Sequence, residues 1–480
     1  MTLKRVLKMI NEGQKEKAAE GFISDIVKNS PFRNKTFIAG GYVRDEFMGL
    51  DPKDVDVVVS LPDGGIKFAE YMTKKMGNYK AGANPVIFPQ FGTAKFELKG
   101  NYKGIDVSGV EVEAVMTRTE EYSKGSRKPN VKPGTLKQDV ERRDFTVNSL
   151  LKDLTTGEII DLTGMGKDDI KKGIIRTPLD PDIIFTEDAL RMLRAIRFTV
   201  KYGWDLPLFM IKAIKKNAKQ IENISSERIK DELDKMLLTN RPKQAIKLLK
   251  ITDLNKYILP ELQDTIGIVQ NKYHTTDVWN HLLSVLEKVP ADVPKRLAAL
   301  FHDIGKPTVK DIIDNEVHFY KHEDVSSEIA EKIMRRLKYP NDVINKVISL
   351  IKNHMRLKNV GDKGEKISDK ALRKFKRDMG DHLEDLLDII DADNKAHSSY
   401  STIHDQISHI RNRLHNLKDA PKTGGSQYNI PITGDDLIKL GIKPGPVFKK
   451  ILATVQDAVD EDPNLTRDEA LEIVKNYMWD

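Results

Sequence analysis

Two kinds of hydrophobic pattern divide the chain. Up to about residue 155, short runs are rich in valine and isoleucine or alternate between apolar and polar residues, as β-strands do. These runs cover residues 37–39, 55–60, 95–100 and 109–117. From residue 187 onward, apolar residues recur at helical spacing almost to the end of the chain. The pattern predicts an α+β protein, with a small mixed sheet followed by helices.

Turn-forming residues separate these regions. Residues 121–139 hold two prolines, two glycines and several lysines, and we expect a basic loop there. A second stretch with little periodicity covers residues 419–436. A chain of 480 residues is too long for one core. We expect four segments: a mixed-sheet head (1–155), a helical neck (156–260), a second helical domain (261–400) and a helical tail (401–480).

The composition narrows the class of protein. Hydrophobic residues make up 39% and charged residues 31% of the chain, which is typical of a folded protein. Cysteine is absent, so disulfides and thiolate zinc sites are excluded. No run approaches the ~18 apolar residues of a membrane-spanning helix, and the first twenty residues lack the apolar block of a signal peptide. We therefore expect a cytoplasmic protein with no membrane partner.

The net charge of +7 is unevenly distributed. Residues 211–250 contain eleven lysines and arginines against five acids. A solvated helical face would account for such a surplus, and a phosphate backbone would also be attracted to it.

The stretch from residue 37 to residue 60 carries the first candidate chemistry. A strand ending at Ala39 leads into Gly40 and Gly41, where the backbone is open to a phosphate, and the next helix begins with Arg44 in its first turns. Asp54 and Asp56 alternate along the following strand, so both carboxylates face the same side. Two carboxylates on one face suit Mg²⁺, which leaves other coordination positions to substrate phosphates. Taken alone, the same pattern also fits solvated residues or a capped turn.

Further segments of the chain favour a functional role for these residues over a solvated or turn-capping one. "RRDFTVN" supplies Arg142, Arg143, Asp144 and Asn148, and "EDALRMLRAIRF" supplies Asp188, Arg191, Arg194 and Arg197. If the second segment is one helix, Asp188 and Arg191 are neighbours three residues apart on its surface. Together with "GGYVRD", "DVD" and "DLTGMGKDDIKKGIIRT", these segments resemble the class II nucleotidyltransferase family of tRNA CCA-adding enzymes and bacterial poly(A) polymerases.

The resemblance implies a head like that of DNA polymerase beta, in which Asp54 and Asp56 hold Mg²⁺ and the "RRD" segment contacts the sugar and triphosphate. It also implies that Asp188 and Arg191 read the hydrogen-bonding edges of cytosine and adenine without a nucleic-acid template. A third carboxylate is expected from Glu113, and Glu111, on the same strand face, stays an alternative.

A second group of candidates consists of histidines and aspartates at the ends or faces of predicted helices. They are His281, His302, Asp303, His322, His354 and Asp393. Imidazole and carboxylate ligands together suit Ni, Mn, Co, Fe or Zn better than Mg. The pattern is similar to the HD phosphohydrolase superfamily, and the resemblance implies that Lys306 faces a phosphate oxygen. A purely structural role for this domain remains the alternative.

The expected function is template-independent addition or repair of the 3′-terminal CCA of tRNA from CTP and ATP, with the acceptor arm bound by the basic neck. The HD resemblance adds a 2′,3′-cyclic phosphodiesterase, 2′-nucleotidase or phosphatase activity. The alternatives are a poly(A) polymerase, and an RNA-binding HD hydrolase with an inactive head. The sequence leaves the oligomeric state open.

Overall fold

The computed structural model describes residues 3–76, 85–121, 130–270, 276–358, 360–361, 363–397, 403–417 and 430–479. The chain forms two compact units, residues 1–258 and 259–480, and each is described here by itself. The division into four segments stays a prediction. No helix of the described residues is both long enough and apolar enough to span a membrane.

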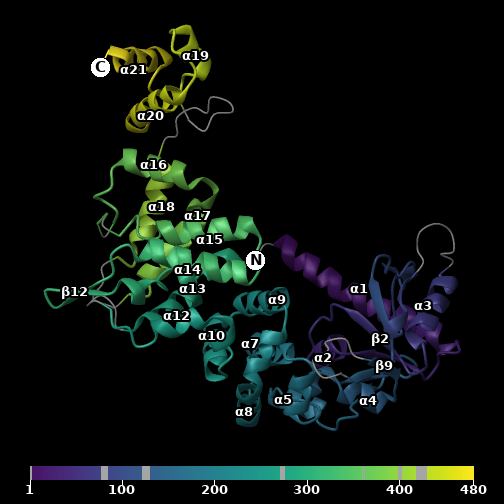
Figure 1. Ribbon diagram of the computed structural model, residues 1–480. Helices are drawn as coiled ribbons and strands as arrows, with labels where there is room; N and C mark the ends of the chain where they lie inside the picture. Colours follow the sequence, from purple (N-terminus) through teal and green to yellow (C-terminus); the bar gives the residue numbers. More distant parts are fainter. Residues whose placement is uncertain are drawn as a thin grey trace. The chain divides into compact units, whose positions relative to one another are not determined.

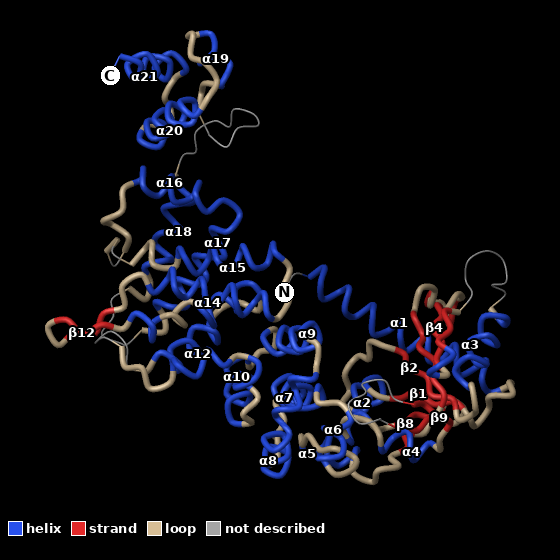
Figure 2. Tube along the Cα trace, viewed as in Figure 1, coloured by secondary structure: helices blue, strands red, loops and turns tan. Residues whose placement is uncertain are grey.

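A seven-stranded mixed sheet is the centre of the first unit, with strand order β11-β10-β1-β2-β7-β4-β3. Strands β2 and β7 are parallel and the other neighbouring pairs are antiparallel. Strand β2 is rich in valine and is buried at every position except Asp56, as expected for a strand covered on both faces. Helix α3 packs on β2, β4 and β7. The expected mixed sheet is confirmed, and Figure 2 shows the strands gathered in this unit, apart from the hairpin that contains β12.

The strands of the first unit have the following bounds: β1 Thr36–Ala39, β2 Val55–Val59, β3 Val86–Phe88, β4 Thr93–Glu97, β5 Asn101–Tyr102, β6 Ile105–Asp106, β7 Glu111–Met116, β8 Arg118–Glu121, β9 Asn130–Pro133, β10 Leu151–Asp153 and β11 Ile159–Ile160. Its helices are α1 Leu3–Lys28, α2 Gly41–Phe47, α3 Gly64–Lys75, α4 Leu136–Glu141, α5 Gly166–Lys172, α6 Pro181–Glu187, α7 Leu190–Tyr202, α8 Leu208–Asn217, α9 Ser226–Leu237, α10 Pro242–Ile251 and α11 Asn255–Ile258 (Figure 1).

The expected loop at residues 121–139 is wrong for its described part. Strands β8 and β9 form an antiparallel pair there, and α4 follows directly. Thr135 starts this helix with a capping box, in which its side chain and that of Gln138 each bond the other's backbone. Proline ends β9 rather than interrupting it, so the turn-forming composition marked the ends of regular elements.

The second unit is helical except for one hairpin among its described residues. Its elements are α12 Val278–Lys288, α13 Val293–Phe301, β12 Asp311–Ile313, β13 Glu316–His318, α14 His322–Arg336, α15 Asn341–Asn353, α16 Asp369–Met379, α17 Leu383–Asn394, α18 Gln406–Asn416, α19 Gly434–Lys439, α20 Pro446–Glu461 and α21 Arg467–Trp479. Helix α13 packs against α12, α15 and α17, and its residues Leu297, Ala298, Ala299, Leu300 and Phe301 are fully buried. The histidines of the second candidate site lie on or next to these packed helices.

Candidate functional site

The turn between β1 and α2 brings open backbone next to a carboxylate. Gly40 has φ 72° and ψ −132°, a conformation that side chains disfavour. A Cβ atom on Gly40 would lie 3.4 Å from Nη1 of Arg143 and 3.9 Å from Oδ2 of Asp56. The glycine therefore provides both the turn and the space between an arginine and an aspartate.

Asp54 and Asp56 flank the start of β2, and both are open to solvent. The parallel register places Asp56 opposite Glu113 on β7, whereas Glu111 lies opposite Glu97 on β4. The surrounding protein partly removes Asp56 from water, and this desolvation is the main cause that raises its pKa to about 6. Glu113 is the second cause, and Arg143 opposes the shift. A carboxylate whose pKa is raised by neighbouring carboxylates lies where a bound cation is stabilising.

Glu113 also has a cationic neighbour. Its Oε2 lies 2.9 Å from Nζ of Lys95 on β4, and this contact raises the pKa of the lysine. Glu113 adjoins Asp56 across the strand pair but does not line the cavity described below. The geometry thus favours Glu113 over Glu111 as a neighbour of the aspartates.

The "RRD" segment is fixed by a buried carboxylate. Asp139 on α4 accepts from Nη2 of Arg142 at 2.6 Å and from Nη2 of Arg143 at 3.1 Å. Asp144 is also buried, and it accepts from Nε of Arg194 on α7 at 2.8 Å. Burial by itself would raise the pKa of Asp144, but Arg194 holds it below its ordinary value. Asp144 therefore fastens α7 to the head and orients Arg194.

Asn148 completes this network. Its amide nitrogen donates to Asp144 at 2.9 Å, and its amide oxygen accepts from Nη1 of Arg44. Arg44 is only 4% exposed and also pairs with Asp45 at 2.7 Å. Its guanidinium lies over the ring of Phe198, 5.3 Å from the centroid. Arg44 is thus held rigidly from three sides.

The chain does not continue as one helix from Glu187 through Asp188, contrary to our expectation. Helix α6 ends at Glu187, Asp188 has φ −145° and ψ 103°, and α7 begins at Leu190. Oδ1 of Asp188 accepts from the backbone N–H of Leu190 at 3.0 Å. An aspartate that caps the next helix can leave the helical conformation because its side chain replaces a backbone hydrogen bond.

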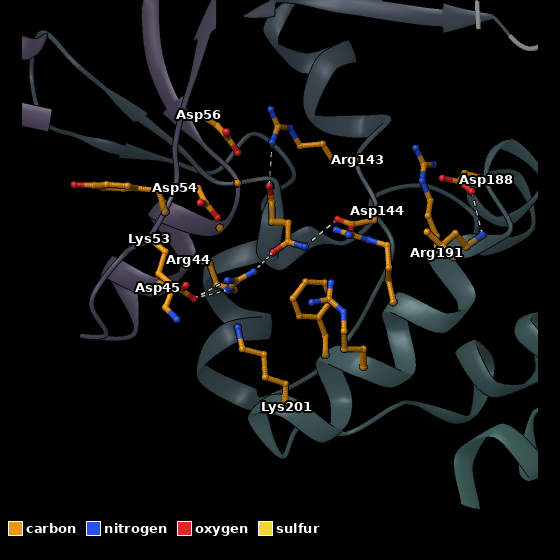
Figure 3. Close-up of a pocket in the computed structure, with 18 of the residues that line it drawn as sticks. Arg44, Asp45, Lys53, Asp54, Asp56, Arg143, Asp144, Asp188, Arg191 and Lys201 are labelled. Carbon is orange, nitrogen blue, oxygen red and sulfur yellow. Dashed lines mark hydrogen bonds and ion pairs between the residues drawn. The ribbon is translucent and has the colours of Figure 1, made fainter. Parts of the chain in front are cut away.

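Asp188 and Arg191 have separate ionic partners. Oδ2 of Asp188 accepts from Nη2 of Arg228 on α9 at 2.8 Å. Arg191 donates to Glu187 at 2.8 Å and to the backbone carbonyl of Arg142, also at 2.8 Å. Figure 3 shows Asp188 and Arg191 at one side of the pocket, with Asp144 beside them.

One cavity of about 510 Å³ collects these groups. Every nucleotide-binding residue that the sequence suggested lines it, together with both strand aspartates: Gly40, Gly41, Arg44, Asp54, Asp56, Arg142, Arg143, Asp144, Asn148, Asp188, Arg191, Arg194 and Arg197. Seven further lining residues were not foreseen: Tyr42, Asp45, Lys53, Leu190, Phe198, Lys201 and Arg228. Nine of the lining side chains are cationic and five are carboxylates, which leaves a surplus of four positive charges.

Some of the unforeseen residues carried a local signal. Lys53 directly precedes Asp54, and Lys201 continues the basic spacing of Arg194 and Arg197 along α7. Arg228 carried none, because its partner Asp188 lies forty residues earlier on another element. Arg197 itself is joined to the buried Glu232 on α9 at 2.7 Å.

The six histidine and aspartate candidates of the second unit converge as expected. All are buried: His281 on α12, His302 and Asp303 after α13, His322 at the start of α14, His354 after α15 and Asp393 on α17. Two groups within this cluster have metal-ligand geometry. One comprises His281, His302 and Asp393, and the other comprises His302, Asp303 and His354.

The imidazole orientations fit a bound cation. Nδ1 of His302 lies 2.9 Å from the carbonyl of Ala299, and Nδ1 of His322 lies 2.8 Å from that of Phe319. Because a carbonyl can only accept, each Nδ1 carries a hydrogen, and in the neutral imidazole each Nε2 presents a lone pair. Nε2 of His322 nevertheless lies 3.3 Å from Nε2 of His354, whose Nδ1 also faces a carbonyl. Lone pairs held this close repel unless a cation lies between them.

Asp303 connects the two halves of this cluster. Its Oδ2 lies 3.3 Å from Nε2 of His302, and its Oδ1 lies 3.1 Å from Nε2 of His322. Burial alone would raise the pKa of Asp303, but His302 and Lys306 hold it well below its ordinary value. Nζ of Lys306 lies 2.6 Å from Oδ2 of Asp303. Lys306 therefore lies beside the cluster, and its role toward a phosphate oxygen stays a prediction.

Two neighbours of the cluster were not foreseen. Nζ of Lys358 forms an ion pair with Asp393, and Nε2 of His397 lies 3.6 Å from Oδ1 of Asp393. His397 is one helical turn beyond Asp393, so spacing could have suggested it. Lys358 follows His354 by four residues in a turn, where no periodic pattern marks it.

Comparisons with known proteins agree with this geometry. The chain matches the Poly A polymerase head domain over residues 36–176, the "Probable RNA and SrmB- binding site of polymerase A" over residues 210–266 and the HD domain over residues 272–395. The CC-adding tRNA nucleotidyltransferase of Thermus thermophilus is 28% identical over 450 residues, covering 90% of this chain and 92% of that protein.

Two further similarities support the assignment. The Multifunctional CCA protein of Neisseria gonorrhoeae is 30% identical over 314 residues, covering 64% of this chain and 70% of that protein. The structure of the Bacillus stearothermophilus CCA-adding enzyme in complex with CTP has the same fold, with a TM-score of 0.66 at 22% identity, covering 97% of this chain and 98% of that one. The chain belongs to the family of CCA tRNA nucleotidyltransferases.

Proposed function

We propose that this protein adds or repairs the 3′-terminal CCA of tRNA, using CTP and ATP and no nucleic-acid template. The observation that carries the proposal is the single cavity that holds two strand aspartates, a row of arginines and the pair Asp188 and Arg191. Nucleotidyl transfer needs an ion site, a triphosphate site and a means of choosing the base. The cavity contains side chains suited to each of these tasks.

The charge of the cavity suits a nucleoside triphosphate. Such a ligand carries about four negative charges near neutral pH, which equals the surplus of positive charge among the lining side chains. Arg143 lies near Gly40 and Arg44 lies near Gly41, where the backbone carries no side chain. Arginines that are already held by Asp45, Asp139 and Asn148 need little reordering to bind phosphate oxygens.

The donor set of Asp54, Asp56 and Glu113 fits Mg²⁺, because hard carboxylate oxygens cluster there and both neighbours raise the pKa of Asp56. When bound, Mg²⁺ would supply charge stabilisation for the attacking and leaving oxygens. The protein's own contribution is to orient the two strand carboxylates on one face and to position the triphosphate by Arg44 and Arg143.

Asp188 and Arg191 are suited to select the base. A carboxylate accepts from the exocyclic amine of cytosine or adenine, and a guanidinium donates to the ring nitrogen beside it. Uracil and guanine present a carbonyl and an N–H at these positions, so they would leave both groups unsatisfied. Selection of C and A follows from the chemistry of this pair.

The tRNA itself would bind through phosphate contacts. Helices α8, α9 and α10 carry most of the eleven basic residues between 211 and 250. Lys212, Lys215 and Lys219 on α8 and the turn after it are exposed. Duplex RNA is recognised by shape and backbone rather than by base edges, so the acceptor arm suits such a surface. This surface belongs to the predicted neck of residues 156–260, and the cytoplasm remains the expected compartment.

The proposal is tested with three tRNA transcripts that end before CCA, after the first C and after the second C. With full-length protein, Mg²⁺ and labelled CTP, the first transcript should gain two C and the second one C; with ATP, the third should gain one A, and addition should then stop. Unlimited addition of A without use of CTP would identify a poly(A) polymerase. Addition of C alone would identify the activity for which the Thermus relative is named. If neither nucleotide enters RNA, the head is inactive.

We propose a second activity for the buried cluster around Asp303: metal-dependent hydrolysis of phosphate esters, such as 2′,3′-cyclic phosphates, 2′-phosphates or simple phosphomonoesters. The imidazole-rich donor set suits Ni, Mn, Co, Fe or Zn, and Nε2 lone pairs already face one another there. Such an ion would lower the pKa of a bound water. Lys306 and Lys358 balance the two carboxylates, so a bound cation leaves the site positive for a phosphate.

This activity is tested by removing metal from the full-length protein and adding back each ion in turn. Hydrolysis of adenosine 2′,3′-cyclic phosphate that depends on the added ion, and that is lost in His302→Ala, would support the proposal. Ion binding measured by calorimetry without hydrolysis of any of the three ester classes would mean that the site is structural.

A further inference from the structure

The base-reading pair presents an electrostatic problem. Asp188 and Arg191 carry opposite charges only three positions apart along the chain. Such pairs can form on a protein surface, and an aspartate and arginine bonded to each other would use acceptors and donors that base reading needs. Among the described residues, no ion pair joins Asp188 to Arg191.

Each member of the pair is instead held by another residue of opposite charge. Arg191 is only 10% exposed, and Glu187 engages it at 2.8 Å. Two backbone carbonyls, of Ile184 and Arg142, accept from the same guanidinium at 3.2 and 2.8 Å. These contacts use three of the hydrogen-bond donors of the guanidinium and leave the others for a ligand.

Asp188 is fixed on two sides. The N–H of Leu190 donates to Oδ1 at 3.0 Å, and Arg228 donates to Oδ2 at 2.8 Å. Each carboxylate oxygen can accept more than one hydrogen bond, so both retain acceptor capacity for the amine of a base. The hydrogen bond from Leu190 by itself fixes one oxygen of Asp188. The second bond, from Arg228, also fixes the rotation of the carboxylate.

Arg228 is placed by a helix other than those that carry the pair. One turn further along α9, Glu232 forms a buried ion pair with Arg197 of α7 at 2.7 Å. Residues 228 and 232 share one face of α9, and α7 and α9 pack closely against each other. The packing of α7 on α9 therefore determines where the guanidinium of Arg228 lies.

We propose that Arg228 is a positioning residue for nucleotide selection, which keeps Asp188 from pairing with Arg191 and orients its carboxylate toward the exocyclic amine of C or A. This inference rests on the proposed nucleotidyl transfer. It extends base selection from the segment 187–191 to α9, forty residues further along the chain.

The test compares kcat/KM of full-length Arg228→Gln and wild-type protein for CTP against UTP on tRNA lacking CCA, and for ATP against GTP on tRNA ending in CC. Glutamine keeps a donor but loses the charge. We expect kcat/KM for CTP and ATP to fall about tenfold, mainly through KM. The preference for CTP over UTP, and for ATP over GTP, should also fall about tenfold. A charge-assisted hydrogen bond contributes binding free energy of about this size. Arg228→Lys should recover most of the preference.

Two controls separate positioning from other roles. Arg335→Gln removes an exposed arginine of α14 that pairs with Glu331, and its kinetics should equal those of wild type. In an Asp188→Ala background, Arg228→Gln should have no further effect on base preference, because it acts through Asp188. An unchanged preference in Arg228→Gln, or an effect that persists without Asp188, would overturn the inference.

Two other outcomes would separate a role in RNA binding from a failure of the proposed function. If Arg228→Gln weakens tRNA binding at an unchanged base preference, the arginine is an RNA contact and not a positioning residue. If wild-type protein incorporates neither CTP nor ATP, the proposed function itself fails, and this result is distinct from a failure of the inference about Arg228.

Discussion

Replacing Glu113 with glutamine tests which carboxylate acts beside the strand aspartates. The pKa of Asp56 is raised to about 6 from an ordinary value of 3.8. Desolvation by the surrounding protein is the largest cause of this shift, and the charge of Glu113 is the next. Neighbouring strands lie about 4.8 Å apart, so we take about 6 Å between the two charges. At an effective dielectric constant of about 20, this repulsion would be ~3 kcal/mol.

Solvent reduces this magnitude considerably. Asp56 is open to water, and Glu113 is 39% exposed and paired with Lys95. Repulsion between exposed charges is strongly screened, so we expect Glu113→Gln to lower the pKa of Asp56 by about half a unit to one unit. Glu111 is not among the main charges that shift Asp56, so Glu111→Gln should change its pKa less than Glu113→Gln does.

The assay is a ¹³C NMR titration of labelled aspartate carboxyls in Mg²⁺-free protein, with the Asp56 signal assigned by Asp56→Asn. Protons and Mg²⁺ compete for the same carboxylate, so Mg²⁺ affinity should weaken as pH falls through about 6. In Glu113→Gln this weakening should occur at lower pH, and incorporation should fall about a hundredfold if a metal ligand is lost. An unchanged pKa in Glu113→Gln, or equal changes in the two variants, would refute the reasoning.

Four other predictions follow from the structure. Asp56→Ala should abolish nucleotide incorporation while tRNA affinity in a filter-binding assay stays near wild type, because the basic helices are untouched; loss of RNA binding would show that the aspartate is structural. Gly40→Ala should reduce incorporation at least tenfold, measured as kcat/KM for CTP, since φ 72° disfavours a side chain and a Cβ would approach Arg143. His302→Ala should remove metal-dependent ester hydrolysis and leave CCA addition intact, and joint loss of both activities would make the second unit only a support. Phe301→Ala, at a fully buried position of α13, should lower the free energy of unfolding of that unit by about 3–5 kcal/mol in urea denaturation, and a loss below 1 kcal/mol would contradict its burial.

Much of the candidate site was predictable because its signals are local. Gly40 and Gly41 follow a strand, Asp54 and Asp56 alternate along the next one, and spacing of this kind determines which face a side chain occupies. The histidine and aspartate cluster was predictable for a different reason. Imidazoles at the ends of apolar helices are uncommon enough that several in one region indicate a shared site.

The expectations that failed concern how local elements begin and end. The prolines and glycines of residues 121–139 indicated a loop, but their described part belongs to β8, β9 and the start of α4. Likewise, helical spacing around Asp188 suggested one helix, because periodicity does not reveal a single residue that leaves the helix and caps the next. Only the conformation at Asp188 separates the two helices.

The sequence by itself determined the mixed sheet, the helical remainder and the place of Asp54 and Asp56 on one face of a strand, since each depends on spacing within one strand or helix. Only the tertiary structure decided which charges are partners. Asp188 is held by Arg228, Asp144 by Arg194 and Asp393 by Lys358, and each pair joins separate elements. Charged side chains have many candidate partners along a chain, and the packing of helices selects among them because ion pairing in water is too weak to specify a partner on its own.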